Sequence, residues 1–136
     1  MSANTFSHIH RVSYAETAPS DHVYYSRYLE MIEECRGEFF RSLGCTLRSI
    51  YDEHGVQFPV RECHLKYRSS ARHDDELTIA ISVSKLSGAR ISLCYEITRN
   101  NTPILSADIE HGCVGAKGKP TRIPPEVSEK LRQISA

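Results

Sequence analysis

Residues 22–43 carry apolar side chains at spacings of three and four, the period of a helix that buries one face. The repeating apolar positions are Tyr25, Leu29, Ile32, Phe39, Phe40 and Leu43. Gly44 follows at the position where helices commonly stop. The spacing predicts a helix of about 20 residues and about 30 Å. An apolar stripe of that length needs another layer of secondary structure to cover it, so the fold must contain a second layer about as long as the helix.

After this helix the period changes from helical to strand-like. In the strand-like run of residues 76–86, alternate positions are apolar from residue 77 to residue 83, and the run of residues 89–99 repeats the pattern from residue 91 to residue 97. Such alternation is typical of an antiparallel sheet that is covered on one face. Ser87–Gly88 and Asn100–Asn101 are turn signals between consecutive strands. The other strand-like runs are residues 5–15, 56–69 and 103–116.

The order of these elements predicts an α+β fold in one domain spanning residues 1–136. A first strand and the long helix precede four meandering antiparallel strands, so a five-stranded sheet wraps around one central helix. Residues 46–55 form either a short second helix or an irregular crossing loop, and Pro124–Pro125 opens a short C-terminal helix. One helix covers one face of the sheet only. The remaining edges predict a homo-oligomer formed by edge pairing or helix contact.

The composition limits the cellular compartment and the classes of binding partner that we expect. The 17 basic and 17 acidic residues cancel, so no global field favours nucleic acid or an acidic membrane surface. No apolar run approaches the roughly 20 residues that span a bilayer, and the N-terminus lacks the apolar core of a signal peptide. The five cysteines are odd in number and scattered, which predicts reduced, mostly buried thiols and a cytoplasmic protein.

Three phrases of the chain, in this order, resemble one family. "HVYYSRYLEMIEECRGEFFRSLG" (residues 22–44) is similar to the "(G)HVYYxxYLxxFExxRxEFLRxLG" of hotdog-fold acyl-CoA thioesterases of the 4-hydroxybenzoyl-CoA thioesterase type. "HLKYRSSARHDDELTI" (residues 64–79) and "HGCVGAKGKPTRIPPEV" (residues 111–127) resemble later segments of that family. The resemblance covers residues 8–125. It implies homodimers or dimers of dimers, with the thioester bound where the helix N-terminus of one protomer meets its partner.

The resemblance breaks at the loop before the helix. The family has "D-T-D-x-x-G" there, and its second aspartate is the catalytic carboxylate, whereas this chain reads "ETAPSD". Glu16 takes the place of the first aspartate, Ala18 that of the catalytic aspartate, and Asp21 stands where a glycine is expected. A methyl group neither attacks a thioester nor deprotonates water, so other groups must supply that step.

Four residues are candidates for the chemistry. The resemblance assigns the carbonyl-polarising N–H to Tyr25, and a helix N-terminus suits a developing oxyanion. Asp21 or His22 would act as base or nucleophile. The alternatives are an N-cap role for Asp21 and a loop-orienting hydrogen bond for His22. Arg36 resembles an arginine that holds the carbonyl in carrier-protein thioesterases, and its alternative is an ion pair with Glu33.

Two further pairs of side chains are weaker candidates for binding a ligand. Arg68 and Arg72 are candidates for binding the phosphates of coenzyme A, although solvated strand ends are the alternative. His8 and His10 share one strand face and would bind a metal only with a third ligand. The sequence offers no further ligand at a suitable spacing, so it predicts no metal site.

The sequence therefore predicts hydrolysis of an acyl-CoA thioester, with coenzyme A as part of the substrate and no separate cofactor. Two alternatives remain open at this point. The first is a thioesterase that acts on polyketide or fatty acyl chains of a carrier protein. The second is an acyl-thioester binder without catalysis, since a fold alone does not specify a function.

Overall fold

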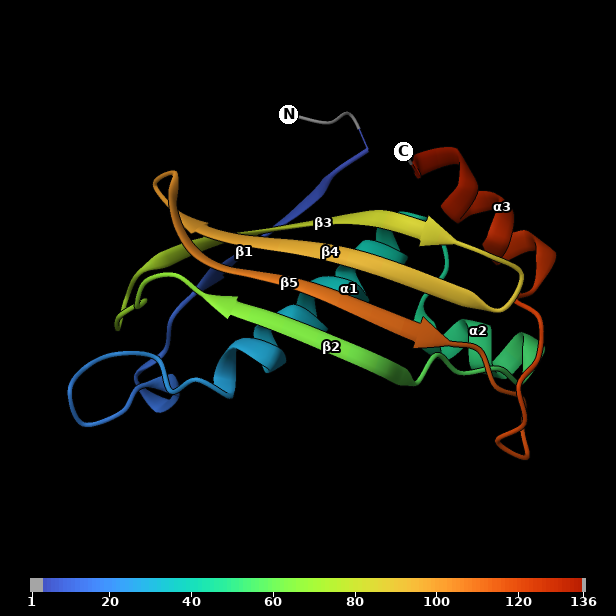
Figure 1. The fold of residues 1–136 in the computed structure, drawn as a ribbon, viewed down its shortest axis with the longest axis horizontal. Helices are drawn as coiled ribbons and strands as arrows, with labels where there is room; N and C mark the ends of the chain where they lie inside the picture. The colour runs from blue at the N-terminus through green and yellow to red at the C-terminus, as the bar shows by residue number, and fades with distance from the viewer. Residues whose placement is uncertain (1–3, 136) are drawn as a thin grey trace.

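The computed structural model describes residues 4–135 as one sheet with three helices and a short 3-10 turn. Figure 1 labels these elements. In chain order they are β1 (Phe6–Arg11), η1 (Tyr14–Glu16), α1 (Arg27–Ser42), α2 (Leu47–His54), β2 (Val60–Tyr67), β3 (Glu76–Leu86), β4 (Arg90–Arg99), β5 (Thr102–Gly112) and α3 (Pro125–Ile134). The predicted α+β class, with five strands and one long helix, is confirmed.

The sheet has the strand order β1-β3-β4-β5-β2, and every neighbouring pair is antiparallel. Only β3, β4 and β5 form the predicted meander. The expectation that β2 belongs to it is wrong, because β2 pairs with β5 and lies at the edge opposite β1. The chain reaches that edge through α1 and α2, which lie between β1 and β2 in sequence. The sheet therefore has two edges, β1 and β2.

Helix α1 lies against one face of the sheet, as Figure 1 shows, and the core is formed between them. The face of α1 that points to the sheet is apolar, and its buried side chains are Tyr28, Met31, Ile32, Cys35, Phe39 and Phe40. Alternate residues of β3 and β4 meet this stripe and are likewise buried. Full burial of a side chain of this size contributes about 1.5–3 kcal/mol, so the helix and sheet stabilise each other.

The start of α1 differs from the prediction. The helix begins at Arg27 rather than at His22, because residues 17–23 form a small hairpin instead of a first helical turn. Thr17 pairs with Val23 at its base. The N–H of Ala18 donates to the carbonyl of His22 at 2.7 Å, so this backbone group is already bonded outside a helix.

Asp21 occupies the tightest point of this hairpin. Its N–H donates to the carbonyl of Ala18 at 2.9 Å, which closes a turn over Pro19 and Ser20. Its φ of 62° lies in the left-handed region. A turn followed by one left-handed residue is a common hairpin connection, and glycine is the residue that adopts that conformation with least strain. This explains physically why a glycine is expected at the position of Asp21.

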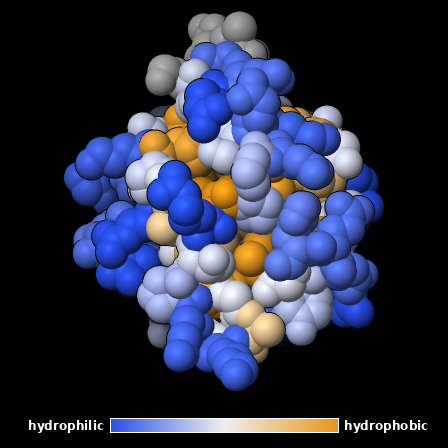
Figure 2. Space-filling view, turned by 90° about the vertical axis from the view of Figure 1, so that its right-hand side faces the viewer, coloured by the Kyte–Doolittle hydropathy of each residue, from blue (hydrophilic) through white to orange (hydrophobic). Residues whose placement is uncertain are grey.

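The opposite end of the molecule carries α2 and α3. The second helix is confirmed: Thr46 caps it, and Gly55 ends it with a φ of 70°. Figure 2 views this end and shows hydrophobic residues in small areas between hydrophilic ones. Within residues 4–135 no helix is long and apolar enough to cross a membrane. All five cysteines are free thiols, of which Cys35 and Cys113 are buried and Cys63 is exposed.

Candidate active site

The entrance of α1 is built from a turn rather than from a capped helix start. The N–H of Arg27 donates to the carbonyl of Tyr24 at 2.9 Å, and Ser26 occupies the N-cap position without a side-chain hydrogen bond. The N–H of Tyr25 has no acceptor among residues 4–135. An amide at a helix N-terminus carries the positive end of the helix dipole, so it suits a negatively charged oxygen.

A groove of about 430 Å³ opens beside this amide. Its walls come from the loop before α1, from the first turn of α1 and from the end of β2. The lining residues are His22, Val23, Tyr24, Tyr25, Tyr28, Tyr67, Arg68, Ser69 and Ser70. Four tyrosines make the groove largely aromatic. Such a surface accommodates an apolar acyl chain and supplies a few polar contacts.

Two of these tyrosines fix the walls of the groove relative to each other. The hydroxyl of Tyr67 donates to the carbonyl of Tyr25 at 2.9 Å, which joins β2 to the helix entrance. The buried hydroxyl of Tyr28 accepts the N–H of Ala71 at 3.1 Å. The rings of Tyr28 and Tyr67 meet edge to face with 5.8 Å between centroids. The Tyr25 backbone is therefore held by the end of β2, and the first turn of α1 by the loop that follows this strand.

The two candidate bases lie in different settings. Asp21 is exposed at the tip of the hairpin, and the predicted N-cap alternative is wrong because α1 starts at Arg27. His22 is half-buried and lines the groove. Its Nδ1 shares a short hydrogen bond with the hydroxyl of Ser20, which orients the ring. The structure therefore brings His22 and Tyr25 together in the groove, whereas Asp21 lies beside it.

The two arginines predicted to meet phosphates lie at the same end of the molecule. Arg68 lines the groove and donates to the hydroxyl of Ser106 at 3.1 Å. Arg72 donates to the carbonyls of Ser20 and Asp21 at 3.3 and 3.4 Å, so it braces the hairpin from outside. Both arginines are exposed. Their role towards a phosphate stays a prediction.

Arg36 lies in a second pocket. Its side chain is 12% exposed, and its guanidinium makes a two-fold contact with the Glu33 carboxylate at 3.0 and 2.9 Å, as the ion-pair alternative predicts. The pocket has a volume of about 260 Å³. Its other lining residues are Leu47, Val56, Gln57, Phe58 and Pro59. Within one chain, the structure therefore does not bring Arg36 into the groove of Tyr25.

Two buried polar groups near Arg36 were not anticipated from the sequence. Tyr95 Oη and His111 Nε2 have no hydrogen-bond partner among residues 4–135. Burial, reinforced by the charge of Arg36, lowers the pKa of His111, while its Nδ1–H donates to the carbonyl of Phe58 at 3.0 Å. Burial also raises the pKa of Tyr95. The alternating pattern of the strands could have indicated both, since each is polar at an inward-facing position.

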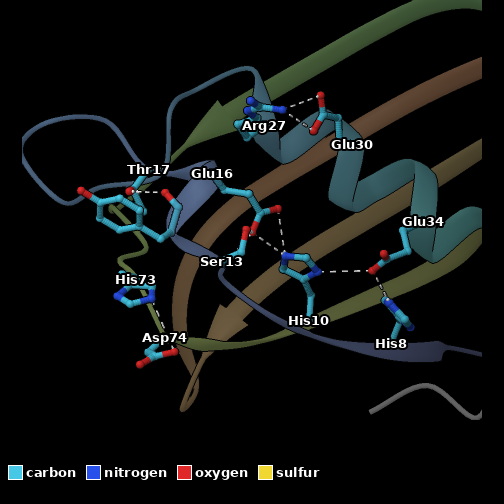
Figure 3. A network of polar contacts seen from close by, with 11 residues as sticks. His8, His10, Ser13, Glu16, Thr17, Arg27, Glu30, Glu34, His73 and Asp74 are labelled. Carbon is cyan, nitrogen blue, oxygen red and sulfur yellow. Dashed lines mark hydrogen bonds and ion pairs between the residues drawn. The ribbon is translucent and has the colours of Figure 1, made fainter.

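Glu16 does not face the groove. Its carboxylate accepts Nε2–H of His10 at 2.9 Å and the backbone N–H of Ser13 at 2.8 Å. Figure 3 shows this contact and its continuation to Glu34 on α1. The side chain at Ala18 is a methyl group, and its backbone is held by the hairpin. Ala18 therefore has no carboxylate, and the carboxylate of Glu16 points away from the groove towards His10 and Ser13.

Comparisons with known proteins place this arrangement in a family. Residues 12–131 match the thioesterase-like superfamily, and the chain belongs to that family. The acyl-CoA thioesterase YbgC of Haemophilus influenzae is 34% identical to this chain over 132 residues, which cover 96% of this chain and 97% of that protein. The 4-hydroxybenzoyl-CoA type and the exchange of a catalytic aspartate for Ala18 stay predictions.

Solved structures support the fold. A probable thioesterase from Bartonella henselae is 31% identical and superposes with a TM-score of 0.83, covering 88% of this chain and 99% of its own. A hypothetical protein from Aquifex aeolicus is 28% identical and has a TM-score of 0.88, covering 93% of this chain and 98% of its own. The antiparallel sheet with its central helix is the hotdog fold.

Proposed function

We propose that the protein hydrolyses an acyl-CoA thioester to the free acid and coenzyme A in the groove at the entrance of α1. The observation that carries this proposal is the N–H of Tyr25, which has no acceptor among residues 4–135 and lies one residue before the N-cap of α1, in the groove that His22 also lines. Membership of the thioesterase-like superfamily and the likeness to an acyl-CoA thioesterase support the same reaction class.

The reaction proceeds by addition and elimination at the thioester carbonyl. His22 takes a proton from water while the water oxygen attacks the carbonyl carbon, and the oxyanion that forms accepts the N–H of Tyr25. The C–S bond then breaks, and the leaving coenzyme A thiolate takes the proton from His22. Asp21 is the alternative base. His22 is the first choice because it lines the groove, whereas Asp21 lies exposed beside it.

The coenzyme A moiety would leave the groove along the exposed basic side chains. Arg68 lines the groove and Arg72 contacts the adjacent hairpin, which supports both as candidates for contacting the phosphates. A guanidinium group binds phosphate oxygens through paired N–H donors. Coenzyme A is part of the substrate, and the reaction requires no separate cofactor.

A second copy of the chain would complete the site. Strand β2 is an edge with one side unpaired, and its residues Val60 and Tyr67 are 53% and 47% exposed. Tyr25, whose carbonyl accepts the hydroxyl of Tyr67 on this strand, is 61% exposed. Exposed apolar side chains along an unpaired edge favour pairing with another strand. We therefore propose a homodimer formed through β2, with further pairing of dimers left open.

The length of β2 determines what such a dimer would bring together. An antiparallel pair centred on His64 places Tyr67 opposite the partner's Arg61, because both are three residues from that centre in the chain. The groove at Tyr25 would then adjoin the partner's pocket around Arg36. This arrangement gives Arg36 a place near the thioester that it does not have within one chain.

The experiment is a hydrolysis screen over short, long and aromatic acyl-CoA esters, read by release of the free thiol. We expect turnover of at least one ester, reduced about 100-fold in His22→Ala, which is typical for loss of a general base. His54→Ala is the matched control, since His54 lies at the end of α2, away from the groove. Unchanged turnover in both His22→Ala and Asp21→Asn would contradict the assigned bases.

The same screen separates the two alternatives. A carrier-protein thioesterase would need carrier-bound substrate, and Arg36→Ala would reduce its turnover more than Asp21→Asn. A binder without catalysis would bind acyl-CoA and release no thiol from any ester. The free thiols of all five cysteines fit a reducing compartment, so we propose that the reaction occurs in the cytoplasm.

A further inference from the structure

The peptide that carries the N–H of Tyr25 is held on both sides by backbone hydrogen bonds. Its carbonyl, which belongs to Tyr24, accepts the N–H of Arg27 at 2.9 Å. The N–H of Tyr24 in turn donates to the carbonyl of Glu16 at 3.0 Å. The first bond belongs to the turn that opens α1, whereas the second reaches across to the short turn η1. The direction of the Tyr25 N–H therefore depends on where the backbone of Glu16 lies.

The side chain of Glu16 fixes that backbone. Its carboxylate turns back on η1 and accepts the backbone N–H of Ser13 at 2.8 Å, while the hydroxyl of Ser13 donates to the same oxygen at 3.2 Å. The N–H of Glu16 donates to the carbonyl of Ser13 at 3.1 Å. Reciprocal bonds of this kind also close the first turn of many helices. Main chain and side chain of Glu16 are thus both bonded to Ser13, so its carbonyl has little freedom to move.

His10 connects the same carboxylate to the rest of the molecule. Its Nε2 lies 2.9 and 3.0 Å from the two carboxylate oxygens of Glu16. The side chains of His10 and Glu16 are 16% and 14% exposed, so little water competes for this contact. The other ring nitrogen, Nδ1, lies 3.3 Å from Glu34 Oε2, which also lies 2.8 Å from His8 Nε2. Figure 3 shows the ring of His10 between the two carboxylates.

The two partners of this ring belong to different layers of the fold. His10 is part of β1, whose six residues all pair with β3, and Glu34 is part of α1. Through one imidazole, the carboxylate of Glu16 is therefore attached to the sheet and to the helix whose entrance lies beside the groove. A reactive group is held accurately only when the residues that support it are themselves fixed by packing and hydrogen bonds.

We propose that Glu16 is a positioning residue for the oxyanion donor, braced by His10. Its carboxylate holds its own carbonyl in place, and that carbonyl sets the direction of the Tyr25 N–H through the N–H of Tyr24. The inference rests on the proposed hydrolysis, in which the Tyr25 N–H binds the oxyanion. Glu16 itself does not line the groove, so it acts without touching the substrate. A donor that is aligned before the reaction stabilises the developing charge without reorganising during it.

This role is separable from a contribution to overall stability. Glu16 and His10 are half-buried, and neither belongs to the apolar core between α1 and the sheet. A change at Glu16 should therefore loosen η1 and the start of the hairpin while the core stays closed. Parts of a protein with few buried apolar contacts open locally at a lower free energy than the core does.

The first test compares two substitutions of Glu16 in acyl-CoA hydrolysis. Glu16→Ala removes every contact of the carboxylate, so we expect kcat to fall about 10-fold, since a misplacement of 1 Å can cost about 100-fold. KM should stay within about two-fold, because an interaction made only in the transition state lowers kcat and kcat/KM equally. Glu16→Gln keeps an oxygen that accepts from Ser13 and should retain at least about one third of the turnover. Glu129→Gln, on α3 at the opposite end, is the matched control.

The second test reads the backbone directly and does not require turnover. In Glu16→Ala, hydrogen exchange measured by NMR should speed up at the N–H of Tyr24, because the carbonyl that accepts it is no longer fixed. This acceleration should exceed that of amides in the centre of β3 and β4 by at least about 10-fold, since those open only with the core. A contribution to stability alone would accelerate both sets equally.

His10→Ala provides a second variant that leaves η1 itself unaltered. It should lower kcat about three-fold and speed exchange at Tyr24 less than Glu16→Ala does. The double variant should be no slower than Glu16→Ala alone, because two residues that act through one network are not additive. Far-UV circular dichroism should confirm that all variants fold.

Three results would overturn the proposal. The first is an unchanged kcat, or unchanged exchange at Tyr24, in Glu16→Ala. The second is an equal loss of kcat in Glu16→Gln and Glu16→Ala, which would assign the charge of the carboxylate a part in the chemistry. The third is equal acceleration of exchange at Tyr24 and in the centre of the sheet. If the unaltered chain hydrolyses no ester, the proposed function fails, and amide exchange alone then decides whether Glu16 holds Tyr24.

Discussion

The hydroxyl of Tyr67, at the end of β2, donates to the backbone carbonyl of Tyr25 at 2.9 Å. These residues lie 42 positions apart in the chain, so the bond joins the edge strand to the entrance of α1. The N–H of Tyr25 is the proposed oxyanion donor. Its direction depends on how the neighbouring peptide is held, and Tyr67 is the side chain that holds it.

Replacement of Tyr67 by phenylalanine tests this relationship. Tyr67→Phe removes one hydrogen bond and keeps the ring, so we expect acyl-CoA turnover to fall about 10-fold. The free energy of unfolding should fall by about 1 kcal/mol or less, because the bond is partly exposed to water. Tyr51→Phe, on the exposed face of α2, is the matched control for loss of a hydroxyl group. Equal turnover in the two variants would show that Tyr67 does not position the peptide.

Asp21 allows backbone strain and chemistry to be separated. Its φ of 62° favours glycine, so Asp21→Gly should be more stable than Asp21→Ala by about 1 kcal/mol in urea unfolding. Both variants remove the carboxylate. If His22 is the base, both retain turnover, whereas a shared loss of turnover would assign the base to Asp21. Equal stability of the two variants would contradict the left-handed conformation.

The methyl group of Ala18 offers a gain-of-function test. Ala18→Asp would place a carboxylate at the position where the resembling family has its catalytic aspartate. We expect acyl-CoA turnover to rise, by about 10-fold or more, because the exchange restores a general base at the position where the resembling family has one. Ala18→Asn, which has the same shape without the charge, is the control. A rise in both variants, or in neither, would argue against the assignment of Ala18 to that position.

The lowered pKa of His111 in the folded state predicts that the free energy of unfolding depends on pH. Burial and the charge of Arg36 lower its pKa in the folded state, so the unfolded chain takes up a proton at a higher pH than the folded chain. Stability from this residue is therefore complete above about pH 6.5 and is lost as the pH falls below that value. One proton gives a slope of at most about 1.4 kcal/mol per pH unit.

The variant His111→Asn isolates this contribution. Its amide can still donate to the carbonyl of Phe58, which Nδ1 of His111 now does at 3.0 Å, but it does not titrate. Chemical unfolding between pH 7.5 and about pH 5 should show a shallower loss of stability in the variant. The same slope in both proteins would mean that other groups cause the acid sensitivity.

Edge strand β2 can be tested for its part in assembly. Val60→Lys places a charge on the exposed edge and should convert a dimer to a monomer, as lysine on an edge opposes pairing. Ile9→Lys is the matched control, because Ile9 is also 53% exposed but lies on the opposite edge strand β1. Sedimentation velocity measures the mass, and turnover should fall with it. A monomeric unaltered chain, or a dimer that survives Val60→Lys, would refute pairing through β2.

The sequence predicted the helices and strands better than it predicted which strands pair. The strand-like run of residues 76–86 matches the bounds of β3, and the predicted apolar face is buried from Leu77 to Val83. The pairing of β2 with β5 was not predictable in the same way, because consecutive strands commonly pair and nothing local opposes this. The position of β2 depends on where α2 ends, which is a property of tertiary packing.

The sequence identified residues that line the groove, but it did not predict how the chain before α1 folds. The residues around Tyr25 were identified, yet the helical period was extended five residues too far, because the apolar pattern continues through Val23 into the hairpin. Backbone pairing of Val23 with Thr17 overrides the local preference. The roles of His111 and Glu34 depend on contacts between elements far apart in sequence, which periodicity does not report.

The central claim is that the groove at Tyr25 hydrolyses acyl-CoA thioesters. Its most direct measurement is the rate of free coenzyme A release from a panel of short, long and aromatic acyl-CoA esters by the purified protein, compared with His22→Ala. The account predicts turnover of at least one ester that falls about 100-fold in the variant. Binding of acyl-CoA with no thiol release from any ester would contradict it.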